Sequence, residues 1–119
     1  MISSSPLILA MALGICPPGP RDNCVVDGDT FWTAGEKIRI ADIDAPEMSG
    51  QCASERALAV KARDRLAEQL GSRFEVERQG KDRFGRTLAI VTVRGRSVGE
   101  ALIAEGLARR WSGRREAWC

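Results

Sequence analysis

The stretch VVDGDTFWTAGEKIRIADIDAPE, residues 25–47, decides the fold of this chain. It contains short β-prone runs separated by turn signals, Asp-Gly-Asp after the first run and Ala-Gly after the second. In the third run Ile38 and Ile40 alternate with Lys37 and Arg39, which is the pattern of a strand with one buried face. The stretch therefore predicts a tight meander of three strands. These strands are expected at residues 24–26, 30–33 and 36–41.

Two helices are expected after the meander. Residues 54–70 carry an apolar stripe at helical spacing, and Ser54 is the expected N-cap. The stripe consists of Leu58, Ala59, Ala62, Leu66 and Leu70. A second, shorter helix is expected to open at a capping box and to stop at Gly106. In this box Ser97 accepts a hydrogen bond from the amide of Glu100, and the Glu100 carboxylate reaches back.

Two further strands are expected at residues 73–78 and 87–93, with a polar loop at 79–85 between them. Five short strands, with one helix between the third and the fourth, follow the order of a five-stranded Greek-key β-barrel, the OB-fold. The sequence therefore predicts a mainly β fold with two to three helices (α+β), in which barrel closure hides the strand edges. An open α+β sheet has the same order of elements and is the alternative.

The amino-acid composition limits which catalytic groups the protein can use. A chain of 119 residues indicates one domain, and its net charge of +2 comes from 15 Arg and 3 Lys against 16 acidic residues. Arginine presents a planar fork of donors that matches phosphate oxygens. The absence of His and Tyr excludes Ser-His-Asp and Cys-His triads and tyrosine nucleophiles. A general base must then be a carboxylate, a metal-bound hydroxide or a lysine. A basic tail, which either steers a polyanion or is a solvated end, contains Arg109, Arg110, Arg114 and Arg115.

Residues 1–20 are expected to lie outside the folded domain, which is expected to span residues 21–119. Residues 1–16 carry no charge and resemble the apolar core of a secretion signal, with a small-x-small cleavage site at residues 10–12. No basic residue precedes this run, and it is too short to cross a membrane. We expect a cleaved or incomplete signal, then a Pro/Gly-rich linker, in a secreted or periplasmic protein.

Four cysteines are expected to form two disulfides, because an even number of cysteines in a small chain is typical of oxidising compartments. Three pairings are open. The favoured one joins Cys52 to Cys119, which ties the chain end to the middle, and leaves Cys16 and Cys24 to close a short loop. Four reduced thiols are the alternative. The lack of a CxxC pair and of histidine disfavours a zinc site.

Acidic residues gather around the end of the meander. Asp42 and Asp44 share one face of an extended segment, and Pro46 redirects the chain so that Glu47 turns back toward the same space. Together with a carboxylate of the DGDT turn, they predict an oxygen site for a hard divalent ion such as calcium. For these acids, the alternative is an acidic surface loop without an ion. For Arg39, the alternative is an ordinary outward charge on a strand.

An ordered set of motifs spans residues 24–108: DGDT, RIxDIDxPE, a helix, DRFGR and GxxVGEALIxEGLA. This set resembles the staphylococcal nuclease-like (thermonuclease) family. The resemblance implies an OB-fold and a calcium-dependent endonuclease that cleaves DNA and RNA at the 5′ oxygen and leaves 3′-phosphate ends. We expect nucleic acid as the substrate, a monomer, and no stable protein partner.

The resemblance also implies roles for individual residues. Asp29 and Asp44 match the calcium carboxylates of the family, and Ala45 lies where the family uses a backbone carbonyl as a ligand. Glu47 matches the general base that takes a proton from the attacking water. The two arginines that hold the scissile phosphate match Arg39 and Arg86.

Lys81, Arg83 and Phe84 are expected to contact the substrate beyond the reacting phosphate, and simple solvated charges are the alternative for Lys81 and Arg83. Phe84 takes the place of a tyrosine in DRFGR and can stack on a base without the hydroxyl bond. Two other function classes stay open at this point. One is a non-catalytic OB-fold module that binds nucleic acid, although such modules typically lose the acids and arginines that this chain has. The other is a disulfide-stapled domain that binds a protein, which only the size and the cysteines support.

Overall fold

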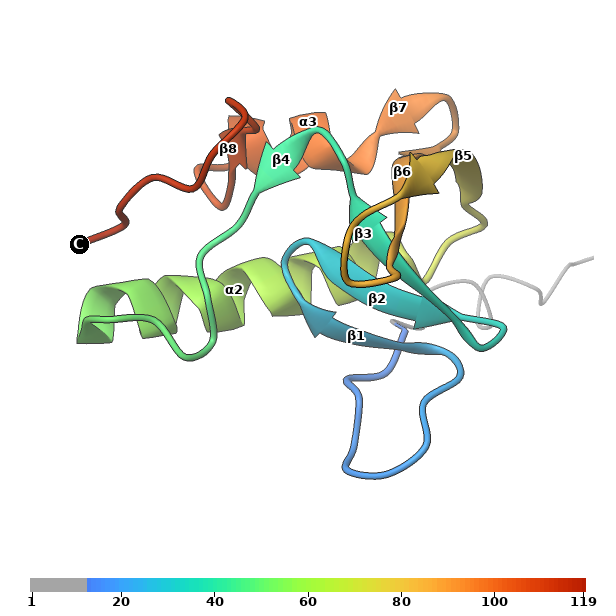
Figure 1. Ribbon diagram of the computed structural model, residues 1–119, viewed down its shortest axis with the longest axis horizontal. Helices are drawn as coiled ribbons and strands as arrows, with labels where there is room; N and C mark the ends of the chain where they lie inside the picture. The colour runs from blue at the N-terminus through green and yellow to red at the C-terminus, as the bar shows by residue number, and fades with distance from the viewer. Residues whose placement is uncertain (1–12) are drawn as a thin grey trace, which may run out of the picture.

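The computed structural model describes residues 13–119, and the secretion-signal prediction for the N-terminus falls largely on residues 1–12, outside the described part. The main sheet has the strand order β1-β2-β3-β6-β5 (Figure 1). The pairs β1–β2, β2–β3 and β5–β6 are antiparallel, and β3–β6 is parallel. Its strands are β1 (Cys24–Asp27), β2 (Thr30–Thr33), β3 (Glu36–Ile40), β5 (Glu75–Lys81) and β6 (Thr87–Val93), and a short β7 (Arg96–Ser97) pairs with β6.

This strand order confirms a mixed α+β fold that is consistent with an OB-fold. The structure does not show the expected barrel closure, because no β-ladder pairs β1 with β5 within residues 13–119. The outer edge of β1 is already occupied. The Val25 amide donates to the carbonyl of Gly14 at 2.8 Å, and the Cys16 amide donates to the carbonyl of Val25 at 3.0 Å. A disulfide between Cys16 and Cys24 holds this segment against β1.

The two helices cover the sheet as their apolar residues predict. Helix α2 (Ala53–Gln69) runs along β1, and α3 (Val98–Ala104) lies over β6 and β7 (Figure 1). From the predicted stripe, Ala59, Ala62, Leu66 and Leu70 are buried, and Leu58 is half-buried. The buried residues form or line the hydrophobic core, which also contains Phe31, Ile38, Ile40, Val91 and Leu102. Burying these side chains is the main stabilising contribution, at roughly 1.5–3 kcal/mol for each large one.

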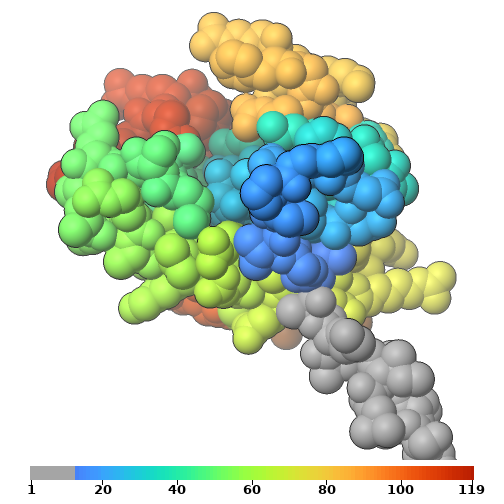
Figure 2. Space-filling view, turned by 90° about the horizontal axis from the view of Figure 1, so that it is seen from below, coloured from blue at the N-terminus to red at the C-terminus, as the bar shows by residue number. Residues whose placement is uncertain are grey.

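The structure corrects the predicted N-cap of the first helix and the predicted bounds of the fourth strand, residues 73–78. Helix α2 begins at Ala53, and its N-cap is Cys52 rather than Ser54. The Cys52 side chain forms no capping hydrogen bond. Strand β5 continues to Lys81 through residues that were expected in a loop, with a β-bulge between Arg78 and Gly80. A bulge allows this extension because Gly80 adopts a φ of +125°, which only glycine adopts readily. The residues that follow β5 stand away from the body of the molecule (orange in Figure 2).

The capping box of α3 is half confirmed. The Ser97 hydroxyl accepts a hydrogen bond from the Glu100 amide at 3.1 Å, as the sequence predicts. The Glu100 carboxylate does not reach back, because it forms an ion pair with Arg110 instead. The helix ends at Ala104, and Gly106 follows with a φ of +76°.

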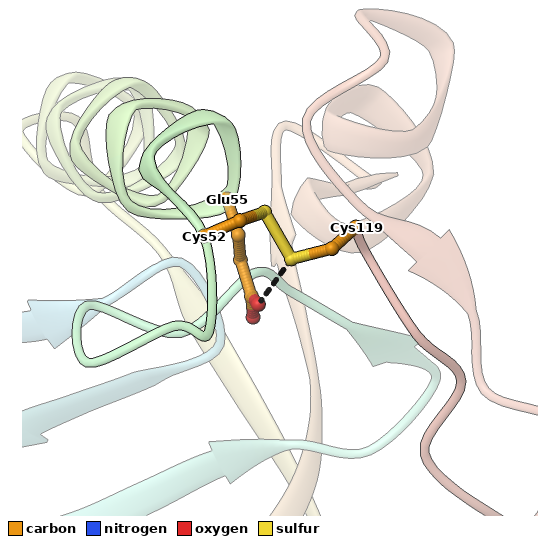
Figure 3. A group of neighbouring side chains, drawn as sticks. All are labelled: Cys52, Glu55 and Cys119. Carbon is orange, nitrogen blue, oxygen red and sulfur yellow. Dashed lines mark hydrogen bonds between the residues drawn. A yellow bond between two sulfur atoms is a disulfide. The ribbon is translucent and has the colours of Figure 1, made fainter.

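The chain end is ordered by a second small sheet and a disulfide. Strand β8 (Arg109–Arg110) pairs antiparallel with β4 (Ile43–Asp44), although the sequence shows no period there. The tail then runs toward the start of α2, where Cys119 is bonded to Cys52 (Figure 3). Both favoured disulfides are therefore present. No helix within residues 13–119 is long and apolar enough to span a bilayer.

Candidate active site

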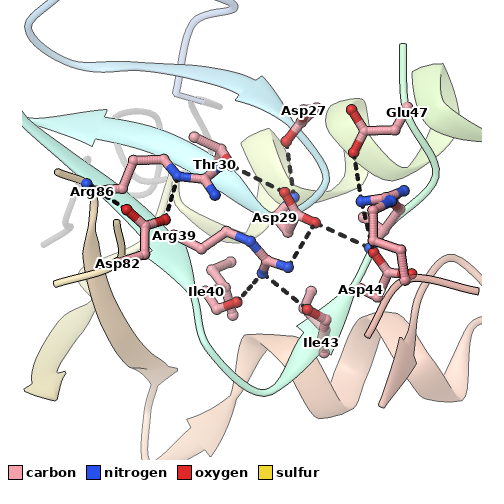
Figure 4. A network of polar contacts seen from close by, with 12 residues as sticks. Asp27, Asp29, Thr30, Arg39, Ile40, Ile43, Asp44, Glu47, Asp82 and Arg86 are labelled. Atoms are coloured by element: carbon pink, nitrogen blue, oxygen red, sulfur yellow. Dashed lines mark hydrogen bonds and ion pairs between the residues drawn. The ribbon is translucent and has the colours of Figure 1, made fainter. Parts of the chain in front are cut away.

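Asp29 is the centre of the polar network in Figure 4. The β1–β2 turn presents it, because the Asp29 amide donates to Asp27 Oδ1 at 3.2 Å and tightens the DGD turn. The Thr30 hydroxyl and the Ala45 amide donate to its two carboxylate oxygens at 3.0 and 3.1 Å. Asp29 is buried, with 3% of its surface exposed, so its charge lies in a largely water-excluded place.

Asp44 and Glu47 approach the same region from the other side. Asp44 ends β4 and is as buried as Asp29. Its Oδ1 atom lies 3.0 Å from Arg115 Nη1 but accepts no hydrogen bond from any described residue. The Ala45 carbonyl adds a neutral oxygen nearby, 3.5 Å from Arg115 Nη2. Buried carboxylate and carbonyl oxygens with a free acceptor position are the donor set that calcium prefers, so these residues fit such an ion.

Asp42 does not join this group, contrary to the alternation argument. Its Oδ2 atom accepts a hydrogen bond from Ser97 Oγ at 3.3 Å, and its carboxylate lies against Gly99 at the start of α3. The alternation fails because Asp42 lies in the turn between β3 and β4, where the chain is not extended.

Arg39 is held rigidly among the acids. It is 8% exposed, and its Nη1 donates to the carbonyls of Ile40 and Ile43, the latter at 2.9 Å. Its Nη2 lies 3.6 Å from Asp29 Oδ2, and the ring of Trp111 covers the guanidinium at 5.7 Å. The alternative of an ordinary outward charge is therefore wrong.

Arg86 reaches the site from the loop between β5 and β6. Asp82 organises this loop by accepting from the amides of Phe84 and Arg86, both at 2.9 Å, and from Arg86 Nε at 2.7 Å. Phe84 is 70% exposed, and the guanidinium groups of Arg83 and Arg86 lie 5.0 and 5.6 Å from its ring centre. A groove of about 780 Å³ connects this loop with Asp29, Arg39 and Glu47. Lys81 is exposed and is not among the residues that line it.

Burial and mutual repulsion raise the pKa values of three acids in or beside the groove, Asp27, Asp44 and Glu47. The pKa of Asp27 rises from 3.8 to about 8, first because burial removes water from the carboxylate and second because Asp29 lies beside it. Burial also raises the pKa of Asp44 and of Glu47, although Arg115 lowers both. A bound cation relieves this repulsion, so the electrostatics of the groove favour cation binding.

The sequence of residues 37–117 matches the family model described as "Staphylococcal nuclease homologue". The chain belongs to this family. Membership confirms the resemblance that the ordered motifs indicated.

Three curated relatives carry names that agree with this family. The "Uncharacterized endonuclease" of Haemophilus influenzae is 30% identical over 118 residues, which cover 91% of this chain and 62% of that protein. The "Thermonuclease" of Staphylococcus hyicus is 34% identical over 92 residues, covering 71% of this chain and 54% of the relative. The "Micrococcal nuclease" of Shigella flexneri is 45% identical over 73 residues, covering 56% and 38%. The chain thus spans less than two thirds of the length of each of these relatives.

Two residues of this staphylococcal nuclease homologue were missed in the sequence. Arg115 was noted only as part of the basic tail, yet its Nη1 lies 2.8 Å from Glu47 Oε2. Glu55 accepts hydrogen bonds from the amides of Glu47 and Gln51 at 3.0 and 3.1 Å. The sequence signal for Glu55 was a glutamate in the first turn of a helix, just after a polar loop.

Proposed function

We propose that this protein is a calcium-dependent nuclease that cleaves phosphodiester bonds in DNA and RNA as an endonuclease and leaves 3′-phosphate ends. The observation that carries the proposal is the joint placement of Arg39, Arg86, Asp29 and Glu47 on one groove. Fixed cations and carboxylates at one place suit a reaction in which a phosphate gains negative charge and water loses a proton.

Asp29, Asp44 and the carbonyl of Ala45 are the proposed calcium ligands. Calcium, when bound, supplies positive charge that stabilises the developing charge on the phosphate oxygens. Asp29 and Asp44 are held by the fold, as buried carboxylates fixed from the β1–β2 turn and from β4. The two carboxylates themselves then need to move little when the site is loaded.

Glu47 is the proposed general base. It lies at the edge of the groove, and burial raises its pKa, which makes it a better proton acceptor than an ordinary carboxylate. Arg39 and Arg86 are proposed to donate to the non-bridging oxygens of the scissile phosphate. Arg39 is fixed by its backbone partners, whereas Arg86 exchanges its bond to Asp82 for the substrate.

The exposed part of the β5–β6 loop is proposed to bind the substrate beside the reacting phosphate. Phe84 offers a stacking face for a base, and Arg83 offers a charge for the next phosphate. Lys81 lies outside the groove and is proposed to add only long-range attraction for the polyanion.

The two disulfides support a secreted or periplasmic location, because such bonds persist in oxidising compartments. We propose that the protein acts there as a monomer without a stable protein partner.

The test is cleavage of an end-labelled single-stranded DNA by the purified chain, with calcium and with a chelator, followed by end-group analysis. Calcium-dependent cutting that leaves 3′-phosphates is expected. A calcium-dependent mobility shift without cutting would instead support a binding module. Cutting that survives the chelator, after repurification, would overturn the calcium assignment.

A further inference from the structure

The guanidinium of Arg115 lies among the oxygen atoms that are proposed above to bind calcium. Its Nη1 is 2.8 Å from Glu47 Oε2 and 3.0 Å from Asp44 Oδ1, and its Nη2 is 3.5 Å from the carbonyl oxygen of Ala45. Two of these three contacts are to proposed calcium ligands, and the third is to the proposed base.

A divalent ion and this guanidinium compete for the same oxygens. Calcium binds oxygen at about 2.3–2.6 Å, so an ion held by Asp44 and Ala45 would lie against the guanidinium and repel it. The Asp44 Oδ1 atom is buried and accepts no hydrogen bond from residues 13–119, so Arg115 contributes charge there without a directed hydrogen bond. A cation that binds Asp44 Oδ1 more strongly can therefore displace the guanidinium of Arg115 from it.

The tail is built to keep Arg115 near the site. On one side, Arg109 pairs with Asp44 across β8 and β4. On the other side, Cys119 is bonded to Cys52 at the start of α2. A side chain tethered at both ends of a short segment has a high effective concentration at its target. The neighbouring Arg114 is exposed and makes no ion pair with any described residue, so the contacts belong to Arg115 specifically.

We propose that Arg115 is an internal competitor for the divalent cation and thereby sets the calcium affinity of the site. This inference rests on the proposed function, since it takes Asp44 and Ala45 as calcium ligands. Loading of the site then requires Arg115 to leave Asp44. The apparent dissociation constant exceeds the intrinsic one by the inverse of the fraction of molecules in which Arg115 has left.

Calorimetric titration of calcium into the full chain tests this proposal. The proteins compared are the wild type, Arg115→Gln and the matched control Arg114→Gln, which removes the same charge one residue away. If Arg115 lies against Asp44 in about nine-tenths of the molecules, Arg115→Gln lowers the apparent dissociation constant for calcium about tenfold. Arg114→Gln is expected to change it by less than about twofold, because an exposed charge is screened.

The possible failures are distinguishable. Equal affinity in the wild type and Arg115→Gln, weaker binding by Arg115→Gln, or an equal gain in Arg114→Gln overturns the competition while leaving the calcium assignment intact. Absence of calcium binding in all three proteins overturns the calcium assignment of the proposed function, and the competition with it.

Discussion

The carboxylate of Glu55 accepts a hydrogen bond from the backbone amide of Glu47 at 3.0 Å, and this bond connects the first turn of α2 to the proposed catalytic base. The same carboxylate accepts from the Gln51 amide at 3.1 Å, so it organises the whole loop between Pro46 and the helix. The Glu47 amide bond is also the first reason that the pKa of Glu55 is lowered. Glu55 is therefore a positioning residue that acts through Glu47.

Replacing Glu55 by Ala is expected to lower kcat roughly ten- to hundredfold, because a base displaced by about an ångström loses its alignment with the attacking water. Glu55→Gln keeps one acceptor oxygen and is expected to fall between Ala and the wild type. Steady-state cleavage of a short labelled DNA at saturating calcium measures both. Wild-type kcat in Glu55→Ala would show that the loop holds Glu47 without this bond.

Arg86 is expected to act in catalysis with little effect on the fold. Its partner Asp82 belongs to the same loop, and the pair is partly exposed, so its contribution to stability is small, at about 0–1 kcal/mol. Arg86→Ala should reduce kcat by about 10²- to 10³-fold, as for other lost donors to a charged transition state. Arg83→Ala, on the same loop, is the comparison and should raise KM only. Equal losses in the two variants would contradict a distinct role for Arg86.

Arg39 differs from Arg86 because it is bound into the structure. It donates to the carbonyls of Ile40 and Ile43, and Arg39→Ala leaves the second of these buried acceptors without its partner. We expect the variant to lose activity and also about 1–3 kcal/mol in the free energy of unfolding. Urea denaturation alongside the cleavage assay measures the two effects. Unchanged stability would mean that water replaces the guanidinium at these carbonyls.

Local signals predict most of the fold. The turns and the alternation in residues 24–41 determine the meander, and the apolar stripe determines α2, because each depends on neighbours along the chain. Barrel closure could not be judged in this way, since the edge of β1 is taken by a segment whose pairing depends on a disulfide. The extension of β5 depends on a bulge at Gly80, which a polar loop does not announce.

In the candidate site too, some residues could be predicted from local sequence motifs, and others depend on the tertiary fold. Asp29, Asp44 and Glu47 lie in motifs whose order along the chain predicts their meeting. Arg115 does not, because it follows Glu47 and Ala45 by about 70 residues in a tail without periodicity. The pairing of β4 with β8 and the Cys52–Cys119 disulfide bring it back. Glu55 was missed because a glutamate in the first turn of a helix is ordinary in sequence, and its burial is visible only in the fold.

The two disulfides should contribute unequally to stability. The Cys52–Cys119 bond joins residues 67 apart, whereas Cys16–Cys24 joins residues 8 apart. In the chain-entropy account, the longer loop is worth about 4 kcal/mol and the shorter one about 2.5 kcal/mol. The double variants Cys52→Ser/Cys119→Ser and Cys16→Ser/Cys24→Ser, compared in guanidinium denaturation, measure the difference. A larger loss from the shorter loop would show that holding residues 14–16 on β1 matters more than chain entropy.

Glu36 should make stability depend on pH in the acid range. Hydrogen bonds from Arg78 Nη2 at 2.6 Å and from Thr87 Oγ1 at 2.7 Å lower its pKa from 4.5 to about 2. Because the folded pKa lies below the unfolded one, this stabilisation is fully present above about pH 4.5 and is lost as the pH falls toward 2. Glu36→Gln should therefore be less stable than the wild type at pH 6, with the difference shrinking between pH 4.5 and 2. Urea midpoints across this range measure it, with the exposed Glu75→Gln as the control. A difference between Glu36→Gln and the wild type that stays constant with pH would mean that the ion pair to Arg78 contributes nothing through its charge.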